Sequence, residues 1–569
     1  MAKTATELRS LLNSIDHRGY PAYKSTAGVY RFEGYYLSID HVQGDPFASP
    51  SHLTIRVPGE SAKFPKDYYE AKPRRVALQD NLTRRFHRVA EKYSRTAQGS
   101  GKSGVIATCA PGPEVLERTA CRIDTASGDV LYRLEVGFPA RGRTIDSGEL
   151  IKILFDFLPE CVREALVFRR ELEKEYTKLL FLADDRAFVR SEMERLNLVA
   201  FVADGAVLPR ESGISQKPMK DARPFKAPES LRVSLELPHR GTLTGMGIPK
   251  GITLIVGGGY HGKSTLLHAL ERGVYDHIAG DGREFVFTDK SAMKLRAEDG
   301  RSVHGVDISL FIRDLPDGRS TKSFSTEDAS GSTSQAANVM EAIEGGSRLF
   351  LIDEDTCATN FMIRDHLMQS VIHPDKEPII PFIDRIRALF EGAGISTILV
   401  AGSFGAFFPI ADTIIQMDRY EPVDITKEAK EAAEKAGAGA GTPEKIMLPE
   451  KGRIPRPLRF LNTGERVKTK TLGRDGFSVN HDTVELRYVE QIVESGQSAA
   501  LAKALLFLGK NCIDGKRTLT ECIDLLMKKL EKEGPDALYP GSYVATGLTL
   551  PRRAELFACL NRCRFLNFE

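Results

Sequence analysis

The amino-acid sequence predicts an α/β core, preceded by an α+β N-terminal domain and followed by a mostly helical C-terminal domain. Three observations support this fold class. An apolar run at 252–256 passes through a glycine-rich turn into a helical pattern at 263–270. Two further apolar runs, 349–352 and 397–401, follow at intervals that leave room for helices. Short apolar runs that alternate with helical patterns are typical of a parallel sheet.

The composition bounds the class of protein. The chain has 569 residues, and a prior of about 150 residues per domain gives three or four domains. Hydrophobic residues make up 41% and charged residues 27%, as in globular proteins, and the net charge of +2 gives no global field that would favour nucleic acid. Its eight cysteines are spread thinly, which indicates free thiols in a reducing compartment.

The sequence offers no sign of a membrane partner. No apolar run approaches the roughly 18 residues that a membrane-spanning helix needs. The first residues, from Met1 to Leu8, lack the apolar segment of a signal peptide. We therefore expect a cytoplasmic protein.

Shifts in composition predict the domain boundaries. We expect the α+β domain, with a basic helix and a helical tail, at 1–220 and the α/β core at 221–423. A charged helix that runs into Ala/Gly repeats predicts a flexible linker at 424–448. A basic segment and a helical domain then occupy 449–569.

Periodicity predicts the elements of the N-terminal domain. A helix at 7–15 is followed by a β-hairpin, 29–32 with 35–39, and by a strand at 53–57. A basic helix is expected at about 78–94, capped by Asp80 or Asn81, with Pro73 upstream. Further strands fall at 104–110 and 129–137. Helices follow at about 147–158, 160–182 and 184–197, before a Pro/Lys/Ser/Gly-rich stretch from 209 to 228.

The window 72–102 is strongly basic, with nine Lys and Arg against two acids. A polyanion-binding surface and a solvated helix face fit this window about equally well. The same window contains Gly99–Gly104, a Gly/Ser/Lys turn that lacks the first glycine of a P-loop and the strand before it. The candidate nucleic-acid contacts here are Arg74, Arg75, Arg84, Arg85, Arg88 and Lys102.

The strand–loop–helix at 252–270 contains the pattern G-x-x-x-x-G-K-S, which in this context is a P-loop. Its glycines let backbone N–H groups turn toward phosphate oxygens, and the helix N-terminus adds partial positive charge. We expect Lys263 to reach the β- and γ-phosphates of ATP and Ser264 to ligate Mg²⁺. The nucleotide-binding residues are Gly257, Gly258, Gly259, Tyr260, His261, Gly262, Lys263, Ser264 and Thr265.

The apolar run 349–352 ends in acidic residues, as the Walker B strand of a P-loop ATPase does. We expect Asp353 to hold Mg²⁺ through water and Glu354 to orient and polarise the attacking water. Taken alone, the run also fits a core strand that ends in an acidic turn. Its place after a valid P-loop favours ATP hydrolysis, with Glu354 and Lys263 as the catalytic residues.

A glutamate directly after the Walker B aspartate indicates the ABC class of ATPases. Ser330-Gly331-Ser332-Thr333-Ser334-Gln335 precedes a helix and is similar to the LSGGQ signature of that class. Small hydroxyl residues at a helix N-terminus suit a γ-phosphate. In this class the phosphate belongs to the nucleotide of the opposite subunit, so we expect a homodimer. The candidate signature contacts are Ser330, Gly331, Ser332 and Gln335.

The match to the ABC class has departures. A switch histidine would fall at about Gly402 or Ser403, and neither is His. The region at 306–311, where we expect the Q-loop, contains no glutamine. His261, inside the P-loop, is either a substitute for one lost function or a variable surface residue.

These departures occur together in a known family. The sequence closely resembles the family described as predicted ATPase of the ABC class. The resemblance is carried by VGGGYHGKSTLLHALERGVYDHI from Val256, FSTEDASGSTSQAANVMEAIE from Phe324 and LIDEDTCATNFMIRD from Leu351. DHVQGDPFASPS from Asp40 and RVKTKTLGRDGFSVNHDTVELRYVEQIVE from Arg466 extend it over most of the chain.

The resemblance implies an ABC-type nucleotide-binding core between N- and C-terminal domains. It also implies a possible RNA partner. One member of the family binds RNA in a mitochondrial mRNA-processing complex, where it forms a ring-like dimer with a basic pore.

A second basic stretch, 451–474, holds one acid among eight basic residues. An extended basic chain suits a phosphate backbone, and Phe460 or Phe477 is placed to stack on a base; a solvated tether fits equally well. Helices are expected at 483–508, 518–533 and 551–560. The candidate nucleic-acid contacts here are Arg453, Arg456, Arg466, Lys468 and Lys470.

The cysteines of the C-terminal region do not have the spacing of a zinc site. Cys512, Cys522, Cys559 and Cys563 include no C-x-x-C pair, so we expect core thiols and no structural zinc. The sequence thus predicts an ABC-class ATPase that uses ATP and Mg²⁺, forms a homodimer and binds nucleic acid, either RNA or DNA, with RNA favoured. The alternative is an ATP-driven protein-assembly or regulatory ATPase without nucleic-acid binding. A transporter subunit is disfavoured by the dedicated flanking domains.

Overall fold

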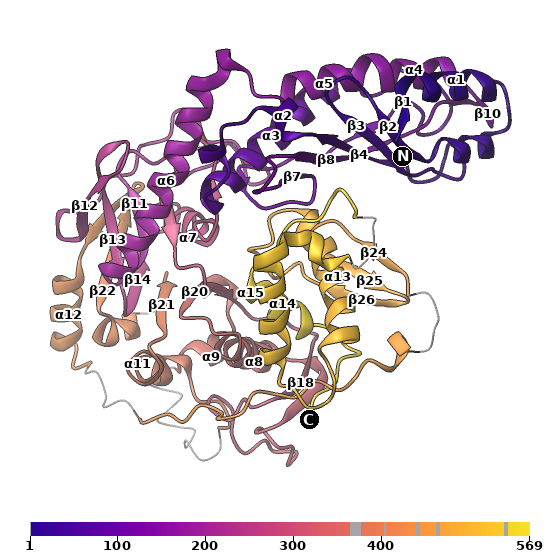
Figure 1. Ribbon diagram of the computed structural model, residues 1–569. Coiled ribbons are helices and arrows are strands. Elements are labelled where there is room, and N and C mark those ends of the chain that lie inside the picture. Colours follow the sequence, from indigo (N-terminus) through magenta and orange to yellow (C-terminus); the bar gives the residue numbers. More distant parts are fainter. Residues whose placement is uncertain (1, 365–376, 403–404, 439–443, 463–466, 540–543) are drawn as a thin grey trace. The chain divides into compact units, whose positions relative to one another are not determined.

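The computed structural model describes residues 2–364, 377–402, 405–438, 444–462, 467–539 and 544–569 (Figure 1). The chain folds into two compact units. The N-terminal unit consists of Met1–Asp184 together with Lys532–Leu550, and the P-loop unit consists of Asp185–Glu531 together with Pro551–Glu569. Among the described residues, no helix is long and apolar enough to cross a bilayer.

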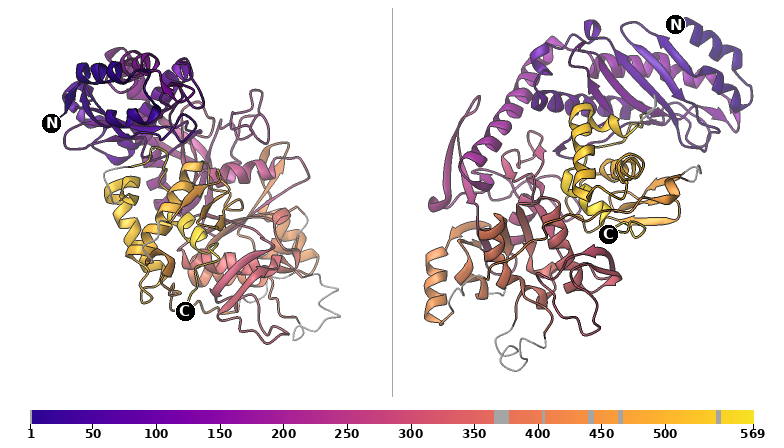
Figure 2. Two further views of the ribbon diagram at one scale, coloured as in Figure 1. Left: turned by 90° about the vertical axis from the view of Figure 1, so that its right-hand side faces the viewer. Right: turned by 60° about the horizontal axis from the view of Figure 1, so that its bottom comes forward.

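The N-terminal unit is a mixed sheet with helices on one face (Figure 2). The strand order is β1-β2-β3-β4-β8-β5, and β7 also pairs with β8. Alternate residues of β4, namely Leu53, Ile55 and Val57, are buried against the helices, which is the period-two pattern of a sheet with one covered face. The strands are β1 Lys3–Thr4, β2 Gly28–Arg31, β3 Tyr36–His41, β4 Ser51–Val57, β5 Ile106–Ala107, β6 Glu114–Val115, β7 Cys121–Ile123, β8 Val130–Val136, β9 Ala140–Arg141 and β10 Thr144–Ile145.

The helices of this unit follow the predicted order with some different boundaries. The expected hairpin forms, because β2 and β3 pair antiparallel. The expected helix at 147–158 is interrupted by a π-turn at Ile153–Phe157. The helices are α1 Ala5–Ile15, α2 Gly59–Ala62, α3 Lys72–Tyr93, α4 Ser147–Lys152, α5 Leu158–Ala165 and α6 Glu173–Arg195, the last of which continues into the P-loop unit.

Helix α3 begins about one and a half turns earlier than the sequence predicts, at Lys72 rather than near residue 78. Pro73 lies in the first turn, where its missing N–H is not needed. Asp80 is therefore not a cap. It lies in the middle of the helix, buried, and pairs with Arg84 and Arg118.

The P-loop unit is built on a sheet of order β17-β20-β21-β14-β22-β23. The first five strands are parallel, and β23 runs antiparallel to β22. All residues of β14, β20 and β21 are buried, as expected for a sheet covered on both faces. The strands are β14 Ile252–Val256, β17 Met293–Leu295, β20 Leu349–Asp353, β21 Ser396–Val400, β22 Thr413–Asp418 and β23 Glu421–Asp424.

Helices and two smaller sheets complete this part of the unit. A four-stranded antiparallel sheet has the order β12-β13-β11-β16, and β18 pairs with β19. These strands are β11 Leu198–Ala203, β12 Arg232–Leu237, β13 Gly241–Pro249, β16 Val286–Thr288, β18 Arg301–Val306 and β19 Phe324–Ala329. The helices are α7 Lys263–Arg272, α8 Gly331–Glu344, α9 Thr359–Met362, α11 Phe382–Ala393 and α12 Thr426–Lys435.

Most of the C-terminal region packs into the same unit, whereas Lys532–Leu550 belongs to the N-terminal unit. Tyr275 donates to Glu555 (2.5 Å) and accepts from Gln497 (2.8 Å), so three distant segments share one buried network. The sequence predicted a helix that begins at 483, but the region 483–494 is not helical. It contains β26 Asp482–Glu485, which forms an antiparallel sheet with β24 Thr469–Thr471 and β25 Gly476–Val479. The helices are α13 Ser495–Asn511, α14 Leu519–Glu533 and α15 Arg553–Leu560.

The cysteines of this region are core residues. Cys512, Cys522, Cys559 and Cys563 are all buried and free, as predicted. Burial raises the pKa of Cys522 to about 12, which keeps its thiol protonated.

Candidate functional site

The P-loop and the acidic strand end lie at one edge of the parallel sheet. Asp353, the last residue of β20, pairs with Val400 of β21, and Val400 pairs with Ile255 of β14. The P-loop begins at Gly257, two residues after Ile255. Because parallel strands place their carboxyl ends at the same edge, the sheet brings Asp353 and Glu354 beside the loop.

The loop needs its glycines at both ends. Gly257 has φ 135° and Gly262 has φ 97°, and both values are in the region that favours glycine. A Cβ at Gly257 would lie 2.4 Å from the carbonyl oxygen of Met417. Between them Gly258 and Gly259 are exposed, and Tyr260 has a φ of 64° and a fully exposed side chain. The sequence thus closes the loop tightly against β22 and leaves its tip in solvent.

His261 ties the loop to the turn after β22. Its Nδ1 accepts a hydrogen bond from the Arg419 N–H (3.0 Å), and its carbonyl accepts from the Tyr420 N–H (3.0 Å). The Tyr420 ring lies where a side chain at Gly262 would project, 2.6 Å from the built Cβ position. His261 therefore joins the loop to the turn that follows β22. Sequence reasoning did not identify Tyr420, which no motif marks.

The first turn of α7 carries the predicted phosphate and metal ligands. The Lys263 ammonium donates to the carbonyls of Gly257 (2.7 Å) and Gly258 (2.8 Å), so it lies along the loop. Ser264 is exposed and Thr265 is half-buried at the helix start. Helix N-terminal N–H groups have no intrahelical acceptors, which makes this turn a ready anion site.

Asp353 has the environment of a metal ligand. Its side chain is 7% exposed, and it accepts one weak hydrogen bond, from the Asp355 N–H at 3.3 Å. No Lys, Arg or His pairs with it among the described residues. A buried carboxylate without a cation is costly, and a divalent cation would offset that cost. Together with the Ser264 hydroxyl, this donor set fits Mg²⁺.

Glu354 is held by backbone at the position expected for the switch histidine. Its Oε2 accepts from the Gly402 N–H at 2.6 Å, a short charge-assisted hydrogen bond. Gly402 lies two residues after the end of β21, so the segment that follows the strand orients the carboxylate. The alternative switch position, Ser403, lies outside the described residues, as does Phe404.

The segment 306–311, the candidate Q-loop region, does not follow the strand next to β20. The strand next to β20 is β17, and its carboxyl end leads into Arg296 and Ala297 rather than into 306–311. The Ala297 N–H donates to the carbonyl of Thr356 (3.0 Å), directly after the acidic turn. The Arg296 guanidinium pairs with Glu490 at 2.6 Å. The segment 306–311 lies after β18, where Phe311 is a core residue.

The signature segment starts helix α8 as predicted. Ser330 is its N-cap residue by backbone geometry, and its hydroxyl lies 3.0 Å from the Thr333 hydroxyl. Gly331 is half-buried, and Ser332 is 8% exposed. Ser334 belongs to the same motif but was not a predicted contact. It is fully buried, and its hydroxyl joins the helix to Glu298 by accepting from the Glu298 N–H (2.9 Å).

Gln335 does not fit a contact with the nucleotide of another subunit. It is fully buried, and its Oε1 accepts from the Ala358 N–H at 2.9 Å. The side chain therefore joins α8 to the segment that follows Glu354. A polar residue at this place was predictable from the motif, but its direction was not.

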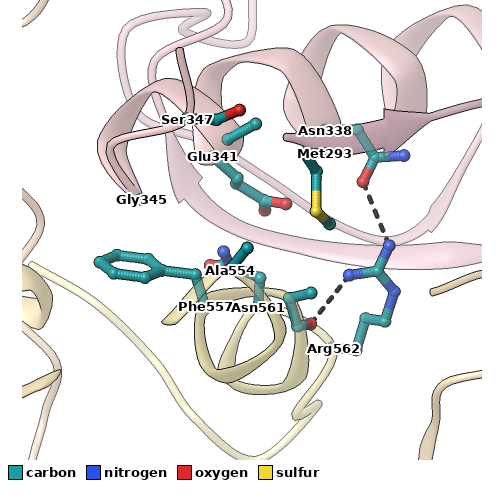
Figure 3. Close-up of a pocket in the computed structure, with 11 residues that line it drawn as sticks. Met293, Asn338, Glu341, Gly345, Ser347, Ala554, Phe557, Asn561 and Arg562 are labelled. Atoms are coloured by element: carbon teal, nitrogen blue, oxygen red, sulfur yellow. Dashed lines mark hydrogen bonds between the residues drawn. The ribbon is translucent and has the colours of Figure 1, made fainter. Parts of the chain in front are cut away.

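Helix α8 is also joined to the C-terminal helix α15 (Figure 3). Arg562 reaches Asn338 of α8 across a small pocket that both helices line, and it ion-pairs with Glu298. Arg301 pairs with Glu341 of α8, and both of these side chains are buried. Burial alone would raise the pKa of Glu298, but the charges of Arg562 and Arg301 outweigh it and lower that pKa.

Most of the basic residues predicted on α3 contact their own unit. Arg74 forms a bidentate pair with Asp184, and Arg84 pairs with Asp80. The Arg75 guanidinium donates to the carbonyls of Tyr69 and Glu70, and that of Arg85 donates to the carbonyl of Glu164. Within the described chain, only Arg88 and Lys102 of this set are exposed without a side-chain partner. Most of these arginines of the window 72–102 thus bind groups of their own unit.

The second basic stretch divides in the same way. Arg453 is 10% exposed and pairs with Glu344, while Arg456 pairs with Glu569 at the surface. Lys470 is exposed on β24, and Lys468 is exposed immediately before that strand. Phe477 is fully buried, so the expected stacking on a base is wrong for that ring. Arg466 lies outside the described residues.

Three family models match the chain. They are an N-terminal domain of ATPases of the ABC class at residues 5–169, the P-loop domain of ABC ATPases at 172–451, and the MRB1590 C-terminal domain at 468–569. The chain belongs to the ATPases of the ABC class. The resemblance seen in the sequence is confirmed, as is an α/β fold with an ABC-type P-loop core.

The individual relative described next matches a smaller part of this ABC-class ATPase than the family models do. An uncharacterized protein of Methanocaldococcus jannaschii, MJ1628, is 35% identical over 188 residues, which are 32% of this chain and 42% of that protein. The chain thus spans less than half of that relative's length.

Two solved structures share the ABC type at low similarity. CbiO1 from Clostridium perfringens, part of the ABC transporter complex cbiONQ, is 16% identical with a TM-score of 0.24, over 37% of this chain and 92% of that one. A bacterial Atm1-family ABC exporter with ATP bound is 14% identical with a TM-score of 0.24, over 53% and 54%.

Proposed function

We propose that this ABC-class ATPase hydrolyses ATP at the edge of its parallel sheet. The observation that carries the proposal is the convergence of the P-loop, Asp353 and Glu354 there, with Glu354 aimed by the Gly402 N–H. A preorganised carboxylate beside a phosphate cradle is what water activation requires.

Each residue has a distinct role in this proposal. The N–H groups of 258–265 and the Lys263 ammonium hold the phosphates. Ser264 and Asp353 would hold Mg²⁺, which neutralises charge on the phosphate oxygens when bound. Glu354 orients the attacking water and accepts its proton as the water oxygen bonds to the γ-phosphorus. The bond from that phosphorus to the β–γ bridging oxygen breaks, and ADP leaves.

We further propose that two copies complete each site. The first turn of α8, with the hydroxyls of Ser330 and Ser332 and the Gly331 N–H, would contact the γ-phosphate bound by the partner. Ser330 and Gly331 are accessible enough for this role, whereas Gln335 is not. The class supports this arrangement, since its signature acts on the opposite subunit's nucleotide.

The partner that best fits the flanking regions is nucleic acid, RNA rather than DNA. Support comes from the sequence resemblance to a family with an RNA-binding member and from the exposed cations on and just before β24. The usable set is smaller than the sequence predicted: Arg88, Lys102, Arg456, Lys468 and Lys470 remain, and Arg466 lies outside the described residues. An ATPase for protein assembly remains the alternative, and nucleic-acid binding decides between the two.

Turnover of Glu354→Gln tests the hydrolytic proposal. We expect kcat to fall at least ~100-fold while ATP stays bound, because only water activation is lost. Asp355→Asn is the matched control, since Asp355 is exposed beside Glu354. With ATP, Glu354→Gln should sediment as a dimer. Unchanged turnover would overturn the role of Glu354, and a monomer with bound ATP would overturn the composite site.

Salt-dependent binding of a mixed-sequence single-stranded RNA tests the nucleic-acid proposal. We expect the wild type to bind at low salt with a linear log–log salt dependence. Lys468→Gln/Lys470→Gln should reduce the slope by about 1.4, since each phosphate contact on a single strand contributes about 0.7. Absence of wild-type binding at low salt would leave the protein-assembly alternative.

A further inference from the structure

A polar cleft of 260 Å³ lies within the P-loop unit, between the last turn of α7 and one end of the sheet β24–β25–β26. Helix α7 contributes His268, Glu271 and Arg272 to its lining. The sheet end contributes Arg474 and Arg487, which flank the paired residues Gly476 and Glu485 of β25 and β26. The backbone bond from the Leu486 N–H to the Asp475 carbonyl (2.7 Å) holds this end closed.

The positive charges of the cleft exceed its unpaired negative charges. Of the three acids in the lining, Glu490 already pairs with Lys294 and Arg296, outside the cleft. Glu271 is buried, and its carboxylate lies 3.3 Å from His268. Asp475 is the remaining acid. Arg474 and Arg487 are both exposed, and neither pairs with a carboxylate in the part of the chain that the structure describes.

Arg272 supplies a donor that is buried but unused. Its Nη1 has no hydrogen-bond partner among the described residues, and its nearest carboxylate, Glu271, is 3.8 Å from its Nε. A buried guanidinium nitrogen without an acceptor is costly, and the Arg272 side chain as a whole is 23% exposed. An anion that bound this guanidinium would offset part of that cost. Guanidinium groups match phosphate oxygens in both charge and geometry.

We propose that this cleft binds a phosphate group of single-stranded nucleic acid, through Arg272, Arg474 and Arg487. This inference rests on the proposed nucleic-acid binding and assigns it a site that the sequence analysis did not single out. Helix α7 places the cleft one helix length from the P-loop, because the helix begins at Lys263 and ends at Arg272. Two further exposed cations are near in sequence to the cleft: Lys470 lies on β24 of the same small sheet, and Lys468 precedes that strand.

Binding of a fluorescent single-stranded RNA to Arg474→Gln/Arg487→Gln tests the inference. We expect at least a tenfold loss of affinity and a salt slope reduced by about 1.4. Arg348→Gln/Lys427→Gln is the matched control, since it removes two exposed cations outside the cleft, and it should retain wild-type affinity. ATP binding should be unchanged in both variants. Arg272→Gln, in the full chain, reports on the buried donor separately.

The outcomes separate the site from the function. Wild-type binding that the cleft variant fully retains overturns the cleft and leaves the proposed function intact. If the wild type binds no RNA but binds inorganic pyrophosphate with ADP present, and the cleft variant does not, the cleft binds a small phosphate compound and the nucleic-acid proposal fails. Absence of both forms of binding in the wild type overturns the cleft and the nucleic-acid proposal together.

Discussion

At the residue scale, backbone groups in this ATPase occupy places where the class uses side chains. Gly402 stands where a switch histidine is expected, and its N–H holds the Glu354 carboxylate. His261 lies in the P-loop, where its ring accepts a hydrogen bond from the Arg419 N–H and joins the loop to the turn after β22. A backbone N–H cannot titrate, so this hydrogen bond from Gly402 does not depend on pH through its donor.

Gly402→Pro should separate orientation from binding. Proline lacks the N–H, so the charge-assisted hydrogen bond to Glu354 is lost, at about 1.5–3 kcal/mol. We expect kcat to fall roughly 10- to 100-fold with ATP affinity unchanged. Gly402→Ala is the control, because it keeps the N–H, and its Cβ would lie 3.9 Å from the Glu354 oxygen. Equal turnover in the two variants would contradict this role.

The motif residues were predictable and the arginines were not. The P-loop, Asp353 and Ser330 follow from local pattern, because their chemistry requires fixed spacing along the chain. The partners of Arg74 and Arg453, namely Asp184 and Glu344, lie about 110 residues away in each case. The number of basic residues in a short segment does not reveal such pairing. A prediction from the sequence therefore counts more exposed, unpaired cations than the structure has.

At the element scale, helix α8 is fixed by buried ion pairs rather than by its own sequence. Arg562 and Arg301 neutralise Glu298 and Glu341 around it, and Asn338 donates to Glu298 at 3.0 Å. The signature turn therefore depends on residues near the C-terminus. A helix whose first turn contacts nucleotide must hold its position closely, and paired charges impose direction as well as contact.

Arg562→Leu should destabilise the P-loop unit by about 3–5 kcal/mol, because it leaves the buried Glu298 carboxylate short of a cation. Urea unfolding measures this as a lower midpoint. Adding Glu298→Gln should recover much of the loss, since it removes the unpaired charge. If the single variant is as stable as the wild type, the ion pair does not hold α8. Lys528→Leu, on the exposed face of α14, is the control.

The predicted boundaries of helices and strands were wrong where tertiary contacts outweighed the local sequence pattern. Asp80 resembles an N-cap, yet Arg118 draws it into the core, and the helix extends back to Pro73. The stretch 483–494 has helical periodicity, yet β26 pairs with β25 through Val484 and Phe477. In both cases the deciding partner lies outside the window that a periodic pattern samples.

At the scale of the whole molecule, the chain passes between its two units more than once. It leaves the N-terminal unit after Asp184 and returns to it for Lys532–Leu550. That returning segment contacts the chain just before β7, where the Thr119 hydroxyl donates to the carbonyls of Ala545 (2.7 Å) and Leu548. The N-terminal unit is therefore completed by residues that are synthesised after the ATPase core.

Asp536→Ala tests how much the returning segment contributes. Asp536 pairs with Arg133 of β8 at 2.9 Å, and the arginine side chain is only 10% exposed. Removing the carboxylate leaves a nearly buried cation, which should cost about 3 kcal/mol. Hydrogen exchange should accelerate in β4, β7 and β8 and stay unchanged in β14, β20 and β21. Lys528→Ala, at an exposed position of α14, is the control. Faster exchange in both sheets, or in neither, would show that the segment does not stabilise the N-terminal unit in this way.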